Sequence, residues 1–312
     1  MTVKPKQKIL VTGASGFLGK TVVKTLLQNI DYKVIAVCHF RKNCNVFPSD
    51  VRLVTEAVNL ENGKALFSLL FKWKPDVVFH LGAMARLQAG EENPEKAVAV
   101  NLLGSMELID LSARFGVKKF LFVSSDLARD ARSVVGINKL LMEYYLQLFP
   151  RQNPEAVTFR MPNLYGFPGS VMDIFARQIA ENKDLSITDE RMARRFITRE
   201  EAAGYLLYLL KNGMHRHVYS VKQDAIFIKD LAEKMMAASG KNLKLRIIGI
   251  RPGEKLYQAS YSDKEADSLD FNNLALLKLL PPSPEQIFLR IDQLPVEKPL
   301  KAVLRNKFRN LF

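Results

Sequence analysis

Three side chains within residues 124–139, SSDLARDARSVVGINK, are of types that can take part in proton transfer. Ser125 can polarise a substrate oxygen by hydrogen bonding, Asp126 can act as an acid, and Lys139 can lower the pKa of neighbouring groups. Each also has an ordinary structural use, because Ser and Asp often cap a following segment and lysines often lie on helix surfaces. The three occur together between an apolar run typical of a buried strand and a helical stretch, and we predict that they are catalytic.

A glycine-rich stretch, TGASGFLG, follows the first apolar run and precedes the first helical pattern. Glycines at such a junction allow a tight turn and let a pyrophosphate approach the N–H groups of the helix N-terminus, whose dipole favours negative charge. The spacing GxxGxxG is looser than GxGxxG, and turn or packing glycines are the alternative, but strand, glycines and helix agree here. We therefore predict a dinucleotide site. Its predicted residues are Gly13, Ser15, Gly16, Phe17, Leu18 and Gly19.

The second apolar run ends at VCHFRKN, without the Asp or Glu that would hold the adenosine ribose hydroxyls of NAD. Arg41 and Lys42 follow instead, and their charges suit a 2′-phosphate, so we predict NADP in preference to NAD. A solvated basic loop is the alternative interpretation. Asn59 and Leu60, at the end of LVTEAVNL, are also predicted cofactor-binding residues, with the Asn59 amide placed to contact adenine.

Apolar strand-like runs alternate with helical stretches along the first half of the chain. The strand-like runs are KILVTGAS, YKVIAVCHF, PDVVFHLGA and VKKFLFVSSD. Such alternation implies right-handed crossovers and a parallel sheet covered on both faces, which is a doubly wound α/β fold. After FRMPNLYGFPGS the alternation becomes less regular, and this change predicts a smaller second lobe.

Composition limits the class of protein. The 312 residues, 48% of them hydrophobic, can bury one large core or one core and a smaller lobe. No apolar run approaches the roughly 18 to 20 residues of a spanning helix, and the start MTVKPKQK lacks a signal-peptide core, so a cytoplasmic protein is expected. Two cysteines and four histidines show no metal-ligand spacing, and no metal is predicted. The net charge of +14 suits nucleotide phosphates, nucleic acid or an acidic membrane equally.

The motifs together resemble the extended short-chain dehydrogenases, and within them the polysaccharide-biosynthesis group of nucleotide-sugar 4,6-dehydratases. The resemblance covers nearly the whole chain and includes PDVVFHLGA, EENPEKAVAVNLLGS, KKFLFVSSD, FRMPNLYG, GSVMDIFARQI, RMARRFIT and IIGIRPGEKLYQ. It implies a UDP-linked amino sugar as substrate, a role in surface polysaccharide or glycan biosynthesis, a homo-oligomer, and no nucleic-acid partner. It also implies that Lys139 holds the nicotinamide ribose.

The same resemblance supplies substrate-binding residues and domain boundaries. The implied substrate-binding residues are Asn163, Arg194, Arg251 and Glu254. The guanidinium of Arg251 suits a phosphate clamp, and a salt bridge to Glu254 is the alternative. We predict a parallel Rossmann sheet with a smaller C-terminal substrate lobe. The predicted boundaries are 1–165 for the NADP-binding domain, 166–290 for a mainly sugar-nucleotide-binding lobe with segments that return to the Rossmann domain, and 291–312 for a basic amphipathic tail.

The chain departs from the pattern of this family at catalytic positions. The family pattern is Ser-Thr-Asp-Lys-Ala followed by Tyr-x-x-x-Lys, with Met at the Tyr position in one branch. Here Leu127 replaces the first lysine, Val135 replaces the tyrosine, and Met84 and Ala85 replace a Tyr-Lys pair. Two interpretations follow: an enzyme of the dehydratase, epimerase or reductase type, or a catalytically degenerate protein that binds NADP and a nucleotide sugar as a sensor or assembly partner.

The tail EKPLKAVLRNKFRNLF combines apolar residues at mostly helical spacing with interspersed lysines and arginines. One interpretation is peripheral contact with an anionic membrane, on its inner face. The other is that the apolar stripe docks on this chain or on a second subunit.

Overall fold

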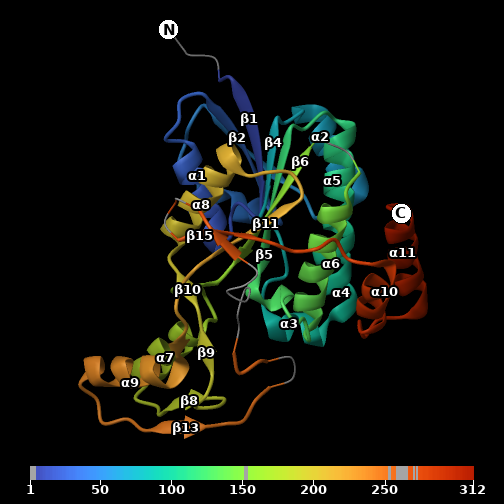
Figure 1. Cartoon of the computed structure of the whole chain (residues 1–312). Helices are drawn as coiled ribbons and strands as arrows, with labels where there is room; N and C mark the ends of the chain where they lie inside the picture. Colours follow the sequence, from blue (N-terminus) through green and yellow to red (C-terminus); the bar gives the residue numbers. More distant parts are fainter. Residues whose placement is uncertain (1–4, 151–153, 252–253, 258–265, 270, 272) are drawn as a thin grey trace.

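The computed structural model describes residues 5–150, 154–251, 254–257, 266–269, 271 and 273–312. A nine-stranded sheet lies at its centre, in the order β14-β15-β11-β6-β5-β4-β1-β2-β3 (Figure 1). The strands are β1 (Gln7–Thr12), β2 (Tyr32–Cys38), β3 (Leu53–Ala57), β4 (Val77–His80), β5 (Lys119–Ser125), β6 (Glu155–Met161), β11 (His217–Val221), β14 (Ala266–Ser268) and β15 (Leu274–Leu277).

Strand direction and order confirm the predicted doubly wound α/β fold. All neighbours from β3 to β11 are parallel, whereas β15 is antiparallel to β11 and β14 is antiparallel to β15. The chain winds outward from β1 to β3 and then returns to place β4 against the other side of β1. Ligands of such sheets bind beside the carboxyl ends of the strands at this reversal.

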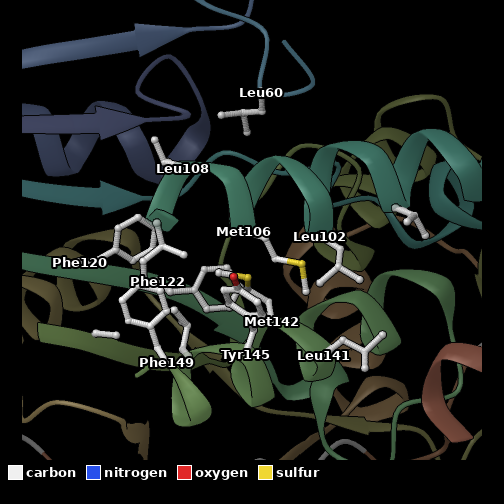
Figure 2. Close-up of a cluster of buried hydrophobic side chains, with 14 of the residues drawn as sticks. Leu60, Leu102, Met106, Leu108, Phe120, Phe122, Leu141, Met142, Tyr145 and Phe149 are labelled. Carbon is white, nitrogen blue, oxygen red and sulfur yellow. The ribbon is translucent and has the colours of Figure 1, made fainter. Parts of the chain in front are cut away.

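Helices cover both faces of the sheet. Successive side chains of a strand point to opposite faces, so apolar residues of one strand pack against helices on both sides. On β1, Leu10 packs with α2, α5 and α6, whereas Ile9 and Val11 pack with α1 and α8. Figure 2 shows part of the first cluster, in which Phe120 and Phe122 of β5 lie near Met142 and Tyr145 of α6. These helices are α1 (Phe17–Leu26), α2 (Gly63–Trp73), α5 (Gly104–Arg114), α6 (Val134–Leu148) and α8 (Arg199–Asn212). On the α2 side, α4 (Pro94–Val98) continues through the π-helical segment η2 (Ala99–Leu103) into α5.

A smaller lobe extends away from the sheet and has its own core (Figure 1). Phe175, Leu185 and Phe196 are buried in that core. The lobe contains β8 (Leu185–Ile187), β9 (Ala193–Arg194), β12 (Ile226–Phe227), β13 (Leu245–Ile247), α7 (Val171–Ala180) and α9 (Ile228–Ser239). The short strands β7 (Asn163–Leu164) and β10 (Phe196–Ile197) pair with each other in parallel, and β11, β14 and β15 of the main sheet come from the same part of the sequence.

The C-terminal tail packs on the chain itself. Leu304 and Phe308 of α11 (Lys298–Arg309) are buried in the cluster that contains α6, together with Ile287 of α10 (Pro284–Asp292). The Phe308 ring meets Tyr145 edge-on, with ring centroids 5.8 Å apart. This is the packing that the docking interpretation of the tail predicts for Leu304 and Phe308, whereas Val303 is exposed. Peripheral contact of the tail with a membrane stays a prediction. Within the described ranges, no helix combines the length and apolarity needed to cross a membrane.

Candidate functional site

The glycine loop lies at the reversal of the sheet, between β1 and α1. Gly13 has a φ of +65°, and a Cβ atom on it would lie 2.7 Å from the backbone nitrogen of Gly82, which follows β4. A Cβ atom on Gly19 would collide with the Gly13 carbonyl oxygen. Backbone alone therefore fits between these segments, and α1 begins with N–H groups that suit a phosphate. Leu60 also approaches Gly82, which places this predicted cofactor residue next to the loop.

The end of β2 presents positive charge where the adenosine ribose is predicted. Arg41 and Lys42 are exposed and begin the 3₁₀ segment η1 (Arg41–Val46). Glu56, near the end of the adjacent strand β3, is a carboxylate that the sequence interpretation overlooked. Its oxygen accepts hydrogen bonds from Lys72 Nζ at 2.7 Å and Trp73 Nε1 at 2.8 Å. Burial opposes the charge of Glu56, but the bonds to Lys72 and Trp73, with the charges of Lys72 and Arg41, outweigh it and lower the pKa of this carboxyl.

Asn59 makes a local contact that the prediction did not include. Its Nδ2 donates to Glu61 Oε2 at 2.9 Å, and its Oδ1 accepts from the Glu61 backbone N–H at 3.2 Å. Lys96 Nζ approaches the same Glu61 oxygen at 2.6 Å. Both polar atoms of the Asn59 side-chain amide are thus bonded to Glu61. Its contact with adenine stays a prediction, and one of these two hydrogen bonds would have to break for that contact to form.

The three predicted catalytic residues meet at the carboxyl end of β5. Ser125 ends the strand, and its Oγ accepts a hydrogen bond from the Leu127 N–H at 3.3 Å, which caps the 3₁₀ turn η3 (Asp126–Ala128). Asp126 is only 1% exposed. Lys139 reaches the same strand from α6, where its Nζ donates to the Val123 carbonyl at 2.7 Å. Burial lowers the pKa of Lys139 to about 8. The fold therefore joins an acid, a hydroxyl and a readily deprotonated amine in one place.

Val135, at the position of the family tyrosine, is covered by a short helix, α3 (Leu87–Glu92). It is 2% exposed, and a Cβ atom on Gly90 would lie 2.5 Å from its Cγ2. Glu91 Oε1 also accepts a hydrogen bond from the Val134 N–H at 2.7 Å. A tyrosine does not fit at position 135 unless α3 moves.

Two buried polar clusters support the site, and the sequence interpretation missed both. His80, at the end of β4, links Thr12 Oγ1 through Nδ1 and Ser105 Oγ through Nε2, both at 2.7 Å. Burial, with a contribution from the charge of Lys139, lowers the pKa of His80 to about 3, so the ring is neutral at physiological pH. The only sequence signal was its place at a strand end, beside the glycine loop.

The second cluster joins β6 to α6. Arg160 pairs with Glu143, and Arg160 Nε lies 3.1 Å from Glu143 Oε1. Ser124 Oγ donates to the same carboxylate. Burial opposes the charge of Arg160, but the Glu143 carboxylate outweighs it and raises the pKa of the guanidinium. Because Ser124 precedes Ser125, this pair fixes the end of β5 where the predicted catalytic residues meet.

The four predicted substrate-binding residues are not equally available. Asn163 Nδ2 donates to the Arg195 carbonyl at 3.1 Å. Arg194 Nη1 donates to the Leu256 carbonyl at 3.1 Å, and burial lowers the pKa of this guanidinium to about 10. Both side chains therefore organise the backbone of the lobe.

Arg251 and Glu254 form a turn in which the Arg251 N–H donates to Glu254 Oε2 at 3.1 Å. The Glu254 N–H donates in return to the Arg251 carbonyl at 3.1 Å. It is the backbone N–H of Arg251, and not its exposed guanidinium, that bonds Glu254, and no salt bridge between the two side chains forms among the described residues. This arrangement suits the predicted phosphate clamp.

Comparison with known proteins agrees with the sequence motifs. The family model for polysaccharide biosynthesis proteins matches residues 9–277. The chain is 31% identical to the UDP-N-acetylglucosamine 4,6-dehydratase (inverting) of Campylobacter jejuni subsp. jejuni, over 86% of this chain and 81% of that protein. It is 27% identical to the probable polysaccharide biosynthesis protein EpsC of Bacillus subtilis, over 82% of this chain. That match covers 45% of EpsC, so the chain spans less than half the length of this relative.

Solved structures give the same fold. The X-ray structure of Pen from Bacillus thuringiensis is similar with a TM-score of 0.81 and 26% identity. The similarity covers 91% of this chain and 92% of that one. The sheet, the glycine loop and the smaller lobe described above therefore form an arrangement that occurs in another protein along nearly its whole length.

Proposed function

Because the chain belongs to the polysaccharide biosynthesis protein family, we propose that it is a cytoplasmic enzyme that modifies a UDP-linked amino sugar with NADP as cofactor. The proposed reaction is 4,6-dehydration, the activity in the name of the Campylobacter relative, within surface polysaccharide or glycan biosynthesis. A homo-oligomer is expected. The observation that carries the proposal is the meeting of Ser125, Asp126 and Lys139 at the end of β5, in a sheet that holds the glycine loop.

The residues of the loop fit a nicotinamide dinucleotide. Packing against Gly82 excludes a side chain at Gly13, and the carbonyl oxygens of Gly13 and Ala14 exclude one at Gly19. A pyrophosphate would therefore meet backbone N–H groups at the start of α1. Lys139 would hold the nicotinamide ribose, and Arg41 would hold the 2′-phosphate. The chemistry that this cofactor supplies when bound is reversible hydride exchange with the sugar.

The chain's own groups supply the proton chemistry. Ser125 hydrogen-bonds a sugar oxygen and fixes the ring. A keto group at C4 acidifies the C5 proton, and Asp126 in its acid form gives a proton to the departing C6 hydroxyl, which leaves as water.

The function is tested by incubating the full chain with NADP and a panel of UDP sugars, followed by mass spectrometry. We expect UDP-N-acetylglucosamine or a close relative to lose one water. A product of unchanged mass but altered sugar stereochemistry would replace dehydration by epimerisation. Tight binding of NADP and UDP sugar without any conversion would contradict the enzyme and support the degenerate binding protein.

The charge at the end of β2 predicts cofactor preference. We expect calorimetry to give NADP a Kd more than tenfold lower than that of NAD, which corresponds to about 1.4 kcal/mol. Arg41→Ala should remove most of this preference, because the guanidinium contacts the 2′-phosphate that NAD lacks. Lys64→Ala, at an exposed position of α2, is the matched control and should leave it unchanged. Equal affinities of the wild-type chain would show that Arg41 and Lys42 are only a solvated loop.

A further inference from the structure

The segment 254–257 is fastened to the smaller lobe by its backbone. The Ala193 N–H donates to the Leu256 carbonyl at 2.9 Å, and the Arg194 guanidinium donates to the same carbonyl at 3.1 Å. Tyr257 forms an isolated parallel bridge with Ala193. Three contacts to β9 therefore fix the direction in which Lys255 leaves this segment.

Lys255 reaches from the lobe to the catalytic turn. Its Nζ donates to the carbonyl of Arg129, the residue that ends the turn beginning at Asp126, across 126 positions of sequence. The side chain is half-buried, and burial lowers the pKa of Lys255 to about 8. Among the described residues, the charges of Asp130 and Asp126 favour the ammonium form, whereas those of Arg132 and Arg129 oppose it. An amine near its neutral point thus lies close enough to the Asp126 carboxyl to interact with it.

None of the residues near the end of β5 that are discussed above has been assigned as the base for the C5 proton. Leu127 and Val135 carry no titratable atom, and α3 covers Val135. Lys139 is 7% exposed and is held against the Val123 carbonyl, where it suits the cofactor ribose. Elimination of water needs a base for the C5 proton as well as an acid for the C6 oxygen, and Asp126 supplies only the acid.

We propose that Lys255 is the second catalytic residue of the proposed dehydratase and that its amine form accepts the C5 proton of the sugar. The C5–H bond breaks, an N–H bond forms on Lys255, and the released electron pair becomes the C5=C6 double bond. The C6–O bond breaks at the same stage, and its oxygen leaves as water with the proton of Asp126. The sugar loses one H and one OH, and the ammonium and carboxylate that result stabilise each other.

This inference rests on the proposed function, and Lys255→Met tests it in the full chain. We expect turnover of the UDP sugar to fall by about 10²- to 10⁴-fold, the range for loss of one acid–base group, while NADP and sugar affinities stay within about threefold. Lys244→Met is the matched control, because Lys244 is an exposed lysine of the same lobe whose backbone N–H, unchanged by the substitution, donates to Asp184. This control should keep wild-type turnover.

A relocated amine distinguishes catalysis from structural support. Position 127 adjoins Asp126, so Leu127→Lys added to Lys255→Met should restore part of the lost turnover. Wild-type turnover should depend on pH in a bell shape, because the amine form of Lys255, whose pKa is about 8, and the acid form of Asp126 are both required. A Lys255→Met enzyme with wild-type turnover and an unchanged pH profile would overturn the proposal.

A spectroscopic readout separates this proposal from the proposed function. In the ¹³C-dimethylated protein, the NMR pKa of Lys255 should fall in Asp126→Asn, because the carboxylate charge that favours the ammonium is lost. An unchanged value would show that the two groups are not coupled and would overturn the proposal even if the enzyme is active. If the wild-type chain converts no UDP sugar, the proposed function fails and the catalytic role fails with it.

Discussion

Replacing Asp126 by Asn is expected to lower turnover by about 10²- to 10⁴-fold while leaving NADP affinity unchanged. The amide has the shape of the carboxyl group but cannot give a proton to the departing hydroxyl. Asp126 lies at the end of β5 and is 1% exposed. Turnover is measured by mass spectrometry of the UDP sugar, and cofactor affinity by calorimetry.

Asp31→Asn is the matched control for this substitution. This substitution also changes a carboxyl group to an amide. Asp31, however, precedes β2 at the opposite end of the strands from Asp126 and pairs with Lys6. Its turnover should equal that of the wild-type chain. If Asp126→Asn retains more than about one third of wild-type turnover, Asp126 is not the acid, and its burial serves only the structure of the turn.

Replacing Arg160 by Met is expected to lower the free energy of unfolding by about 3–5 kcal/mol. The Arg160 and Glu143 side chains are 4% and 1% exposed, so loss of the guanidinium leaves a buried carboxylate without its counter-charge. Urea denaturation followed by the fluorescence of the single tryptophan, Trp73, gives this free energy. The substitution should also reduce turnover, because Ser124, next to Ser125, bonds to the same carboxylate.

Two further variants show whether the cost comes from the unpaired charge. Adding Glu143→Leu to Arg160→Met should recover most of the lost stability, since a buried ion pair is often replaced by apolar groups at little cost. Arg246→Met breaks a pair with Asp184 in which the arginine side chain is 73% exposed, and it should cost less than about 1 kcal/mol. A double variant as unstable as Arg160→Met would mean that lost packing, and not unpaired charge, causes the effect.

The valine at position 135, where the family pattern has tyrosine, goes together with close packing of α3 on α6. Gly90 allows α3 to approach Val135, and Glu91 caps the start of α6, so the two helices are packed more closely than a tyrosine at 135 would allow. If Lys255 is the second proton-transfer group, the site uses an acid from the sheet and an amine from the smaller lobe. Catalysis would then depend on how the lobe is held, and Arg194, which bonds to the Leu256 carbonyl, would be a positioning residue.

The sequence by itself determined the architecture of the sheet and the place of the cofactor loop. Alternation of apolar strands with helices is a local, periodic signal, and each strand carries it independently of the others. The glycines are equally local, because the tight turn at Gly13 depends on a backbone conformation that other residues rarely adopt. Ser125 and Lys139 followed from the same logic, since the carboxyl ends of parallel strands gather at one edge of the sheet.

Only the tertiary structure decided which side chains are available for chemistry. Glu61 engages the amide of Asn59, and α6 receives the apolar stripe of the tail through Phe308. Lys255 meets the turn of Asp126 across more than one hundred residues of sequence. The physical reason is that these contacts depend on the distances between segments that are remote in the chain, and on the burial that shifts their pKa values. Neither quantity is encoded in the spacing of neighbouring residues, so the partners of a buried charge become known only when the segments are packed together.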